Sequence, residues 1–150
     1  MKRLAQCHCG SLRAKTSGDP LMVSLCQCRD CQRSTGAVAG SGAVFEKAEV
    51  TTEGKWKLFE RAGADGRKVR FRFCPNCGTS LYWEGNFNPN LRIVAVGAFA
   101  DPTFPAPLVS VYERSRHDWL QLPDGMARAQ RGLVSLAATV DDRPLGERMR

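Results

Sequence analysis

The stretch KVRFRFCPNCG, residues 68–78, contains the two patterns that decide the fold. Apolar and basic residues alternate over its first six positions, which is the period-two pattern of a β-strand with one buried and one wet face. The strand leads directly into the C-x-x-C pair Cys74 and Cys77. Pro75 and Gly78 supply the tight bend that aims both sulfurs at one point. The stretch therefore predicts a strand that ends in a metal-binding turn.

On both sides of this stretch, the sequence pattern is typical of short strands separated by glycine-containing turns. No long helical apolar stripe occurs before Pro123, so the body is expected to be all-β or nearly so. The largely apolar segment LRIVAVGAFA is expected to form a central strand. The expected strands are residues 37–45, 49–54, 56–61, 68–74 and 91–100, with turns at GADGRK (63–68) and GNFNPN (85–90).

The length of 150 residues predicts one domain, over residues 1–125. Residues 126–150 change in character and are expected to form a C-terminal tail that is partly ordered or a short helix. No apolar h-region follows the basic residues at the start, and IVAVGAFA is too short to span a bilayer. We therefore expect a soluble, cytoplasmic protein without a membrane partner.

Seven cysteines fall in three clusters, which indicates metal binding. Disulfides are uncommon in a reducing compartment, and an odd number of cysteines cannot pair completely within one chain. The three clusters are Cys7 with Cys9, Cys26 with Cys28 and Cys31, and Cys74 with Cys77.

The formal charge of +7 overstates how basic the metal-loaded protein is, because zinc binds thiolates. If seven thiols ionise and two Zn²⁺ bind, the change is −7 + 4 = −3, which leaves about +4. This mild excess suits a small anionic substrate. Nucleic acid is an unlikely partner, because the basic residues are scattered and not interleaved with aromatic residues.

The C-x-C spacings predict how the sulfurs are presented. Residues two apart in a strand point to the same face, so Cys7 with Cys9, and Cys26 with Cys28, are each expected to offer two sulfurs on one side. His8 would then point away and is not expected to bind the same ion.

Seven sulfurs divide most naturally into a closed tetrahedral site of four and an open site of three that keeps one position for water or substrate. We favour a structural site on Cys7, Cys9, Cys74 and Cys77, and an open site on Cys26, Cys28 and Cys31. Two alternatives stay open on spacing alone. In one, Cys28 and Cys31 join Cys74 and Cys77 as a zinc ribbon. In the other, every site is structural, and water or His117 completes the second.

Four motifs in this order resemble the glutathione-dependent formaldehyde-activating enzyme family, which includes proteins related to centromere protein V. The resemblance covers roughly Ala5 to Gly125 and leaves the tail out. The motifs are CHCG (7–10), CQCRDCQRSTG (26–36), FCPNCGTSL (73–81) and SRHDWLQLPDG (115–125).

The resemblance implies a zinc-bearing β-tent of small antiparallel sheets. It implies a structural zinc on the set of four cysteines and a second zinc on the set of three. In some members the second zinc leaves when glutathione binds, so a labile site is implied as well. The implied activity adds glutathione to formaldehyde, giving S-hydroxymethylglutathione, and is that of a carbon-sulfur lyase. The alternative is a zinc-stabilised binding module or a thiol or metal sensor without catalysis.

Residues outside the clusters suggest how a thiol substrate would be held. We predict that Arg29, Arg33, Arg114 or Arg116 binds its carboxylates. His117 would shuttle a proton, unless it only bonds to Asp118 or to backbone. Ser34 and Thr35 are expected to form a turn after the cysteines, and their hydroxyls are expected to bond to sulfur.

Overall fold

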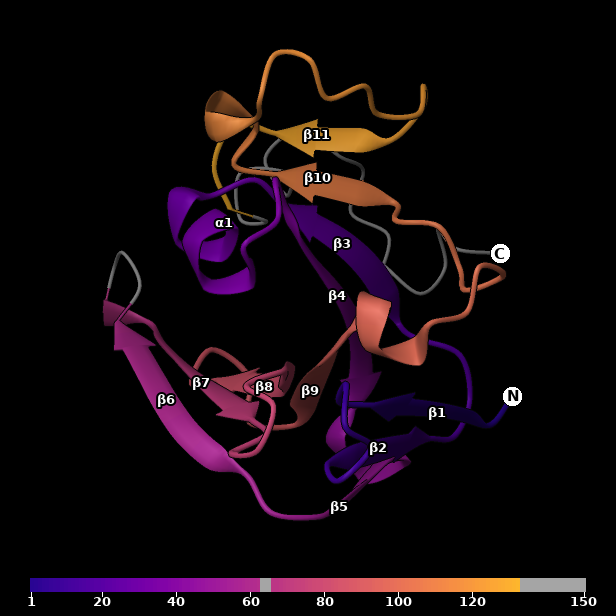
Figure 1. Ribbon diagram of the computed structural model, residues 1–150. Helices are drawn as coiled ribbons and strands as arrows, with labels where there is room; N and C mark the ends of the chain where they lie inside the picture. Colours follow the sequence, from indigo (N-terminus) through magenta and orange to yellow (C-terminus); the bar gives the residue numbers. More distant parts are fainter. Residues whose placement is uncertain (63–65, 133–150) are drawn as a thin grey trace. The chain divides into compact units, whose positions relative to one another are not determined.

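The computed structural model describes residues 1–62 and 66–132, and its architecture is mainly β, as the sequence predicted (Figure 1). The chain divides into two compact units. The first consists of Met1–Leu21 and Gly42–Phe104, and the second of Met22–Ser41 and Pro105–Arg150. No helix in the described ranges is long and apolar enough to cross a membrane.

The first unit contains a small antiparallel sheet in the strand order β1-β2-β5. In β2, Ala14 and Thr16 are buried while Arg13 and Lys15 face outward. This alternation gives the sheet one packed face and one wet face. The strands are β1 (Arg3–Gln6), β2 (Arg13–Thr16) and β5 (Val50–Glu53).

A longer antiparallel array in the first unit runs in the order β4-β9-β8-β7-β6. Its strands are β4 (Gly40–Glu46, in this unit from Gly42), β9 (Leu91–Ala95), β8 (Ser80–Gly85), β7 (Lys68–Phe73) and β6 (Lys57–Ala62). The predicted turn at 85–90 follows β8, whereas the turn predicted at 63–68 includes residues 63–65, which lie outside the described residues.

Strand β7 confirms the alternation that the sequence predicted. Phe71 is buried, and Lys68 and Arg70 are exposed. On the apolar face, the Phe71 ring lies between Phe59 of β6 and Trp83 of β8, with ring centroids 6.5 and 5.5 Å away. Such cross-strand aromatic contacts stabilise neighbouring strands.

The core of the first unit contains the fully buried side chains Leu12, Phe45, Leu81 and Val94. The Phe45 ring lies 6.4 Å from Phe99, which stacks on Phe104 at 4.5 Å. Phe99 belongs to the 3₁₀ helix η3 (Val96–Phe99), and another such helix, η1 (Lys47–Glu49), precedes β5.

The strand predicted over residues 91–100 was too long. Strand β9 ends at Ala95, and the chain turns through η3 to Ala100, which has a left-handed backbone with φ of 48°. The turn buries Phe99, and burial of this large ring is the physical reason that an apolar run continues beyond the strand.

The second unit contains short parallel strands in the order β11-β10-β3. They are β3 (Met22–Cys26), β10 (Val109–Val111) and β11 (Ala127–Ala129). All three residues of β10, the middle strand, are buried. The family resemblance implied antiparallel sheets, which the first unit has, whereas these pairs are parallel. The sequence pattern did not reveal them, because a three-residue strand is too short to show a period.

Strand β11 begins within the predicted tail, 126–150, of which residues 133–150 lie outside the described residues. The domain boundary at residue 125 stays a prediction.

The second unit also contains the helix α1 (Arg29–Thr35) and the 3₁₀ helix η4 (Glu113–Ser115). Helix α1 begins at Cys28, whose sulfur accepts a hydrogen bond from the Cys31 N–H. It ends at Gly36, which has a left-handed φ of 67° and bonds to the Gln32 carbonyl. The helix buries no residue, so it has no apolar stripe from which to predict it.

Candidate functional site: two cysteine clusters

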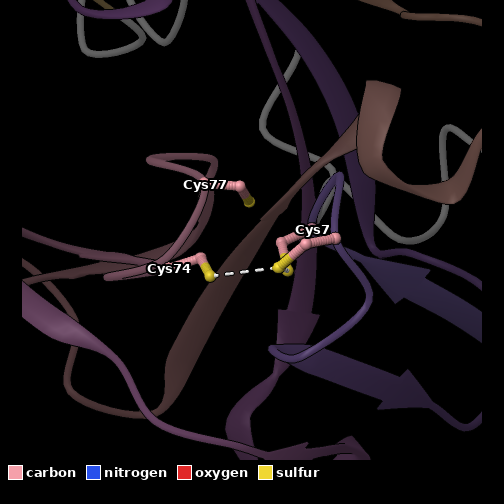
Figure 2. A group of neighbouring side chains, drawn as sticks. Cys7, Cys74 and Cys77 are labelled. Atoms are coloured by element: carbon pink, nitrogen blue, oxygen red, sulfur yellow. Dashed lines mark hydrogen bonds between the residues drawn. The ribbon is translucent and has the colours of Figure 1, made fainter.

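The first cluster brings Cys7, Cys9, Cys74 and Cys77 together within the first unit. Figure 2 labels three of them, Cys7, Cys74 and Cys77. Cys7 and Cys9 follow β1, and Cys74 and Cys77 lie in the turn between β7 and β8. The four sulfurs all lie within 4.8 Å of one another. The Cys7–Cys9 and Cys9–Cys74 separations are 3.6 and 3.7 Å.

The prediction that Cys7 and Cys9 lie on a strand was wrong, because β1 ends at Gln6 and both cysteines lie in a turn. In that turn the Gly10 N–H donates to the Cys7 carbonyl, and Gly10 has a positive φ of 75°. The second loop repeats this design, with the Gly78 N–H donating to the Cys74 carbonyl at φ of 77°. The second turn is one residue longer than the first, and each ends at a glycine with positive φ.

Hydroxyl groups and backbone N–H groups surround these sulfurs. The Ser11 hydroxyl lies 3.0 Å from Cys9 Sγ and 3.2 Å from Cys74 Sγ, and the Leu12 N–H donates to Cys7 Sγ at 3.2 Å. Gly54 packs against the same loop, where an added Cβ would lie 1.9 Å from the Ser11 carbonyl oxygen. The backbone of this loop is therefore held closely in place.

These contacts set the pKa values of the thiols. Hydrogen bonds from Ser11 and then Asn76 lower the pKa of Cys9 to about 5. Hydrogen bonds from Thr79 lower the pKa of Cys77 to about 7. Burial raises the pKa of Cys7, which has only 1% of its surface exposed. The thiols of Cys9 and Cys77 therefore ionise readily, whereas the buried thiol of Cys7 needs a cation to stabilise its thiolate.

Two of the sulfur separations match those of a tetrahedral zinc site, and all four sulfurs lie within 4.8 Å of one another. A Zn–S distance of about 2.3 Å gives a tetrahedron with edges of about 3.8 Å, close to the separations found here. His8 is exposed and is not part of the group, and its backbone N–H donates to the Thr79 hydroxyl at 3.2 Å. The residues therefore fit a closed four-sulfur metal site.

The second cluster consists of Cys26, Cys28 and Cys31, all in the second unit and all half-buried. Cys26 ends β3 and Cys28 caps α1, so the prediction that both lie on a strand was wrong for Cys28. The three sulfurs lie within 4.8 Å of one another. Within residues 1–62 and 66–132, no fourth His, Cys, Asp or Glu completes this group.

The crowding of these thiols opposes their ionisation. The neighbouring thiols of Cys28 and then Cys31, together with burial, raise the pKa of Cys26 far above its ordinary value. Thiolates so close together need a cation among them, and three sulfurs leave one coordination position of a tetrahedral ion free. The residues fit an open metal site.

Two glutamines next to these cysteines were missed by the sequence analysis. Gln27 is completely buried, and its Nε2 donates to the Ser110 hydroxyl at 3.3 Å. Gln32 Nε2 donates to the carbonyls of Gln27 and Ser115 at 2.7 and 2.9 Å. Their only signal in the sequence is their position beside Cys26, Cys28 and Cys31.

The four predicted arginines differ in their surroundings. Arg29 and Arg33 are exposed on α1, and Arg114 is exposed on η4. Arg116 is half-buried, donates to Glu113 Oε2 at 2.9 Å and also bonds to the Leu120 carbonyl. Its guanidinium therefore holds the loop together, and its binding of a substrate stays a prediction.

Three polar contacts differ from those expected. His117 Nε2 lies 2.9 Å from Gln32 Oε1, where a bond to Asp118 or to backbone was expected. The hydroxyls of Ser34 and Thr35 donate to the Cys31 carbonyl, at 3.3 and 2.7 Å, where bonds to sulfur were expected. A hydroxyl on a helix commonly bonds to a carbonyl one turn earlier, which explains the second difference.

Within its two units, the structure thus groups the sulfurs as four and three.

Comparisons with known proteins identify the fold and the family of the chain. A crystal structure of a Rhodobacter sphaeroides protein from structural genomics has the same fold, with a TM-score of 0.51 at 18% identity, covering 84% of this chain and 98% of that chain. None of the curated proteins matches the chain. The family model described as glutathione-dependent formaldehyde-activating enzyme matches residues 2–115. With its motifs, its mainly β fold and its two cysteine clusters, the chain belongs to the glutathione-dependent formaldehyde-activating enzyme family.

Proposed function

We propose that the protein is a zinc-dependent enzyme of the carbon-sulfur lyase type, which adds a small thiol such as glutathione to a small aldehyde such as formaldehyde. The product with these substrates is S-hydroxymethylglutathione. Family membership supports a reaction of glutathione and formaldehyde. The observation that carries the proposal is the group of three sulfurs from half-buried cysteines, which, among the residues that the structure describes, is one ligand short of a closed zinc site.

The two clusters have different roles in this proposal. Cys7, Cys9, Cys74 and Cys77 hold a structural zinc, because four sulfurs with tetrahedral spacing leave no position for a substrate. Cys26, Cys28 and Cys31 hold a second, exchangeable zinc. When bound, this zinc lowers the pKa of an incoming thiol and holds its sulfur. A reducing compartment such as the cytoplasm keeps all seven cysteines available as ligands.

Exposed cations beside the open cluster favour an anionic thiol. Three thiolates and Zn²⁺ have a net charge of −1, and a substrate thiolate makes this −2. Arg29 and Arg33, which flank Cys31 on α1, and Arg114 on η4 offset this charge and bind the carboxylates of a glutathione-like molecule. The proposed partners are thus small molecules.

A serine at Cys28 tests the proposal. Cys28→Ser should lower the zinc content from two ions to one per chain and abolish thiol-aldehyde turnover, measured by metal analysis and by loss of free formaldehyde. Ser34→Ala is the matched control on the same helix, since the Ser34 hydroxyl bonds to the Cys31 carbonyl, and this variant should keep both zincs.

Retention of two zincs and full turnover by Cys28→Ser would rule out the open-site proposal. Release of one zinc from the unmodified protein on adding glutathione, without any turnover, would instead indicate a sensor.

A further inference from the structure

The side-chain amide of Gln32 has only one orientation that its neighbours permit. One end of this amide lies 2.7 Å from the Gln27 carbonyl oxygen and 2.9 Å from the Ser115 carbonyl oxygen. Carbonyl oxygens only accept hydrogen bonds, so the end that faces them must be the NH₂ group. The oxygen Oε1 therefore faces the other way, toward His117.

This orientation determines which nitrogen of His117 carries a proton. His117 Nε2 lies 2.9 Å from Gln32 Oε1, and an amide oxygen has no proton to donate. Nε2 must therefore be the donor, which leaves the lone pair of the neutral imidazole on Nδ1. His117 is an exposed residue.

The loop that presents His117 is itself held in place. Arg116 bonds to Glu113 and to the Leu120 carbonyl, and the His117 ring lies 5.5 Å from the ring of Trp119, which is 65% exposed. Gln32 is the residue next to Cys31 on α1. The imidazole is thus attached, through one side chain, to the helix that contains a ligand of the open cluster.

We propose that Gln32 is a positioning residue that holds His117 as the proton carrier for the thiol-aldehyde addition, with Nδ1 as its working atom. This inference rests on the proposed function. The thiol proton passes to Nδ1 while a bond forms between sulfur and the aldehyde carbon. The π-electron pair of the carbonyl moves to its oxygen, which then takes the proton from Nδ1. The addition has no leaving group and needs no oxidant or reductant.

A spectroscopic test examines the positioning without any turnover. In a long-range ¹H–¹⁵N correlation spectrum, His117 should show a proton on Nε2 that exchanges slowly because Gln32 binds it, and an unprotonated Nδ1. The slow proton should be lost in Gln32→Met, which is similar in length and has no amide. The chain has one other histidine, His8, so His8→Asn assigns the signals. A proton on Nδ1 of His117 in the unmodified protein would overturn the inference.

A kinetic test examines the proton transfer. His117→Gln keeps an amide donor for Gln32 and removes the base, so it should lower kcat by about 100-fold or more, the usual contribution of a general base. Adding Gln32→Met to His117→Gln should then lower kcat little further. Gln32→Met alone should lower kcat nearly as much as His117→Gln does. Zinc content should stay at two per chain in each variant, and His8→Asn should turn over normally.

The outcomes separate this inference from the proposed function. If His117→Gln keeps full turnover, His117 is not the proton carrier, although the enzyme proposal stands. If the unmodified protein has no turnover with glutathione and formaldehyde while the slow Nε2 proton is present, the enzyme proposal and the catalytic role of His117 both fail, and Gln32 is left with a purely structural role.

Discussion

The hydroxyl of Ser11 connects the two loops of the four-cysteine cluster. It lies within hydrogen-bonding distance of a sulfur from each, at 3.0 Å for Cys9 and 3.2 Å for Cys74. A hydroxyl that donates to a thiolate stabilises the charged form, which is why the pKa of Cys9 falls to about 5 from an ordinary value of 9.0. Ser11 makes the largest of these contributions, followed by Asn76, and together they prepare an exposed cysteine for metal binding at neutral pH.

Replacing Ser11 with alanine should therefore raise the pKa of Cys9 toward 9.0. A thiol whose pKa is lowered by folding adds stability that is fully present above pH 9 and is lost as the pH falls through about 5. Metal-free Ser11→Ala should lose most of this contribution. The measurement is the rate of Cys9 alkylation against pH, followed by peptide mass spectrometry.

Ser17→Ala is the control, because the Ser17 hydroxyl is exposed and bonds to the Glu49 carbonyl. An unchanged alkylation profile in Ser11→Ala would mean that another group sets the pKa of Cys9.

Strand β8 carries a carboxylate that connects several elements of the first unit. Glu84 lies 2.7 Å from Arg92 of β9, and 3.3 Å from both Arg72 of β7 and Lys47 of η1. Burial raises the pKa of Glu84, but the hydrogen bond from Arg92 and the charges of Arg72 and Arg92 outweigh it, so the pKa lies below its ordinary value. The Tyr82 ring lies against the guanidinium groups of both arginines.

Glu84→Gln should lower the free energy of unfolding by about 2 kcal/mol, the size expected for losing charge-assisted hydrogen bonds at a mostly buried group. Because folding lowers the pKa of Glu84, its contribution is present above the ordinary value of 4.5 and fades as the pH falls below it. Urea unfolding at pH 7 and at pH 3 measures both effects.

Glu60→Gln is the matched control on β6. Its ion pairs with Lys68 and Arg70 are more exposed, so its loss should lower the free energy of unfolding less than the loss of the Glu84 carboxylate does. If the two variants lose the same free energy of unfolding, the partial burial of Glu84 adds nothing to the strength of its ion pairs.

At the scale of the whole molecule, each unit has a cysteine cluster of its own. The first cluster joins sequence positions that are 65 residues apart, whereas the second lies within six residues of chain. A metal that joins distant segments of the folded chain adds its binding free energy to folding. A metal held by one short loop has less effect on the stability of distant elements.

Zinc should therefore stabilise the molecule mainly through the first cluster. When free zinc is 100 times its Kd, the expected gain is about 2.7 kcal/mol. Cys74→Ser should lower Tm clearly, and Cys31→Ser should lower it less, as measured by calorimetry. Each variant should lose one equivalent of metal. If a chelator removes all of the metal and the Tm stays that of the metal-loaded protein, a structural zinc is contradicted.

Local patterns in the sequence were enough to predict several features. Strand β7 and the Cys74–Cys77 turn were predicted because period-two burial and a Pro-x-Cys-Gly bend are encoded within a few residues. Helix α1 was not predicted, because a short helix without buried residues has no amphipathic pattern. Three-residue parallel strands such as β10 and β11 likewise have no period to detect.

The sequence by itself determined that this protein is mainly β and that its cysteines occur as closely spaced ligand sets, because strand alternation and C-x-x-C bends are local properties of the chain. Only the tertiary structure decided which sulfurs meet and what surrounds them. Gln32 and His117, for example, are 85 residues apart and become hydrogen-bonded only when β3, α1 and the loop after β10 fold together. Contacts over such separations depend on packing of the whole unit, which no short stretch of sequence encodes.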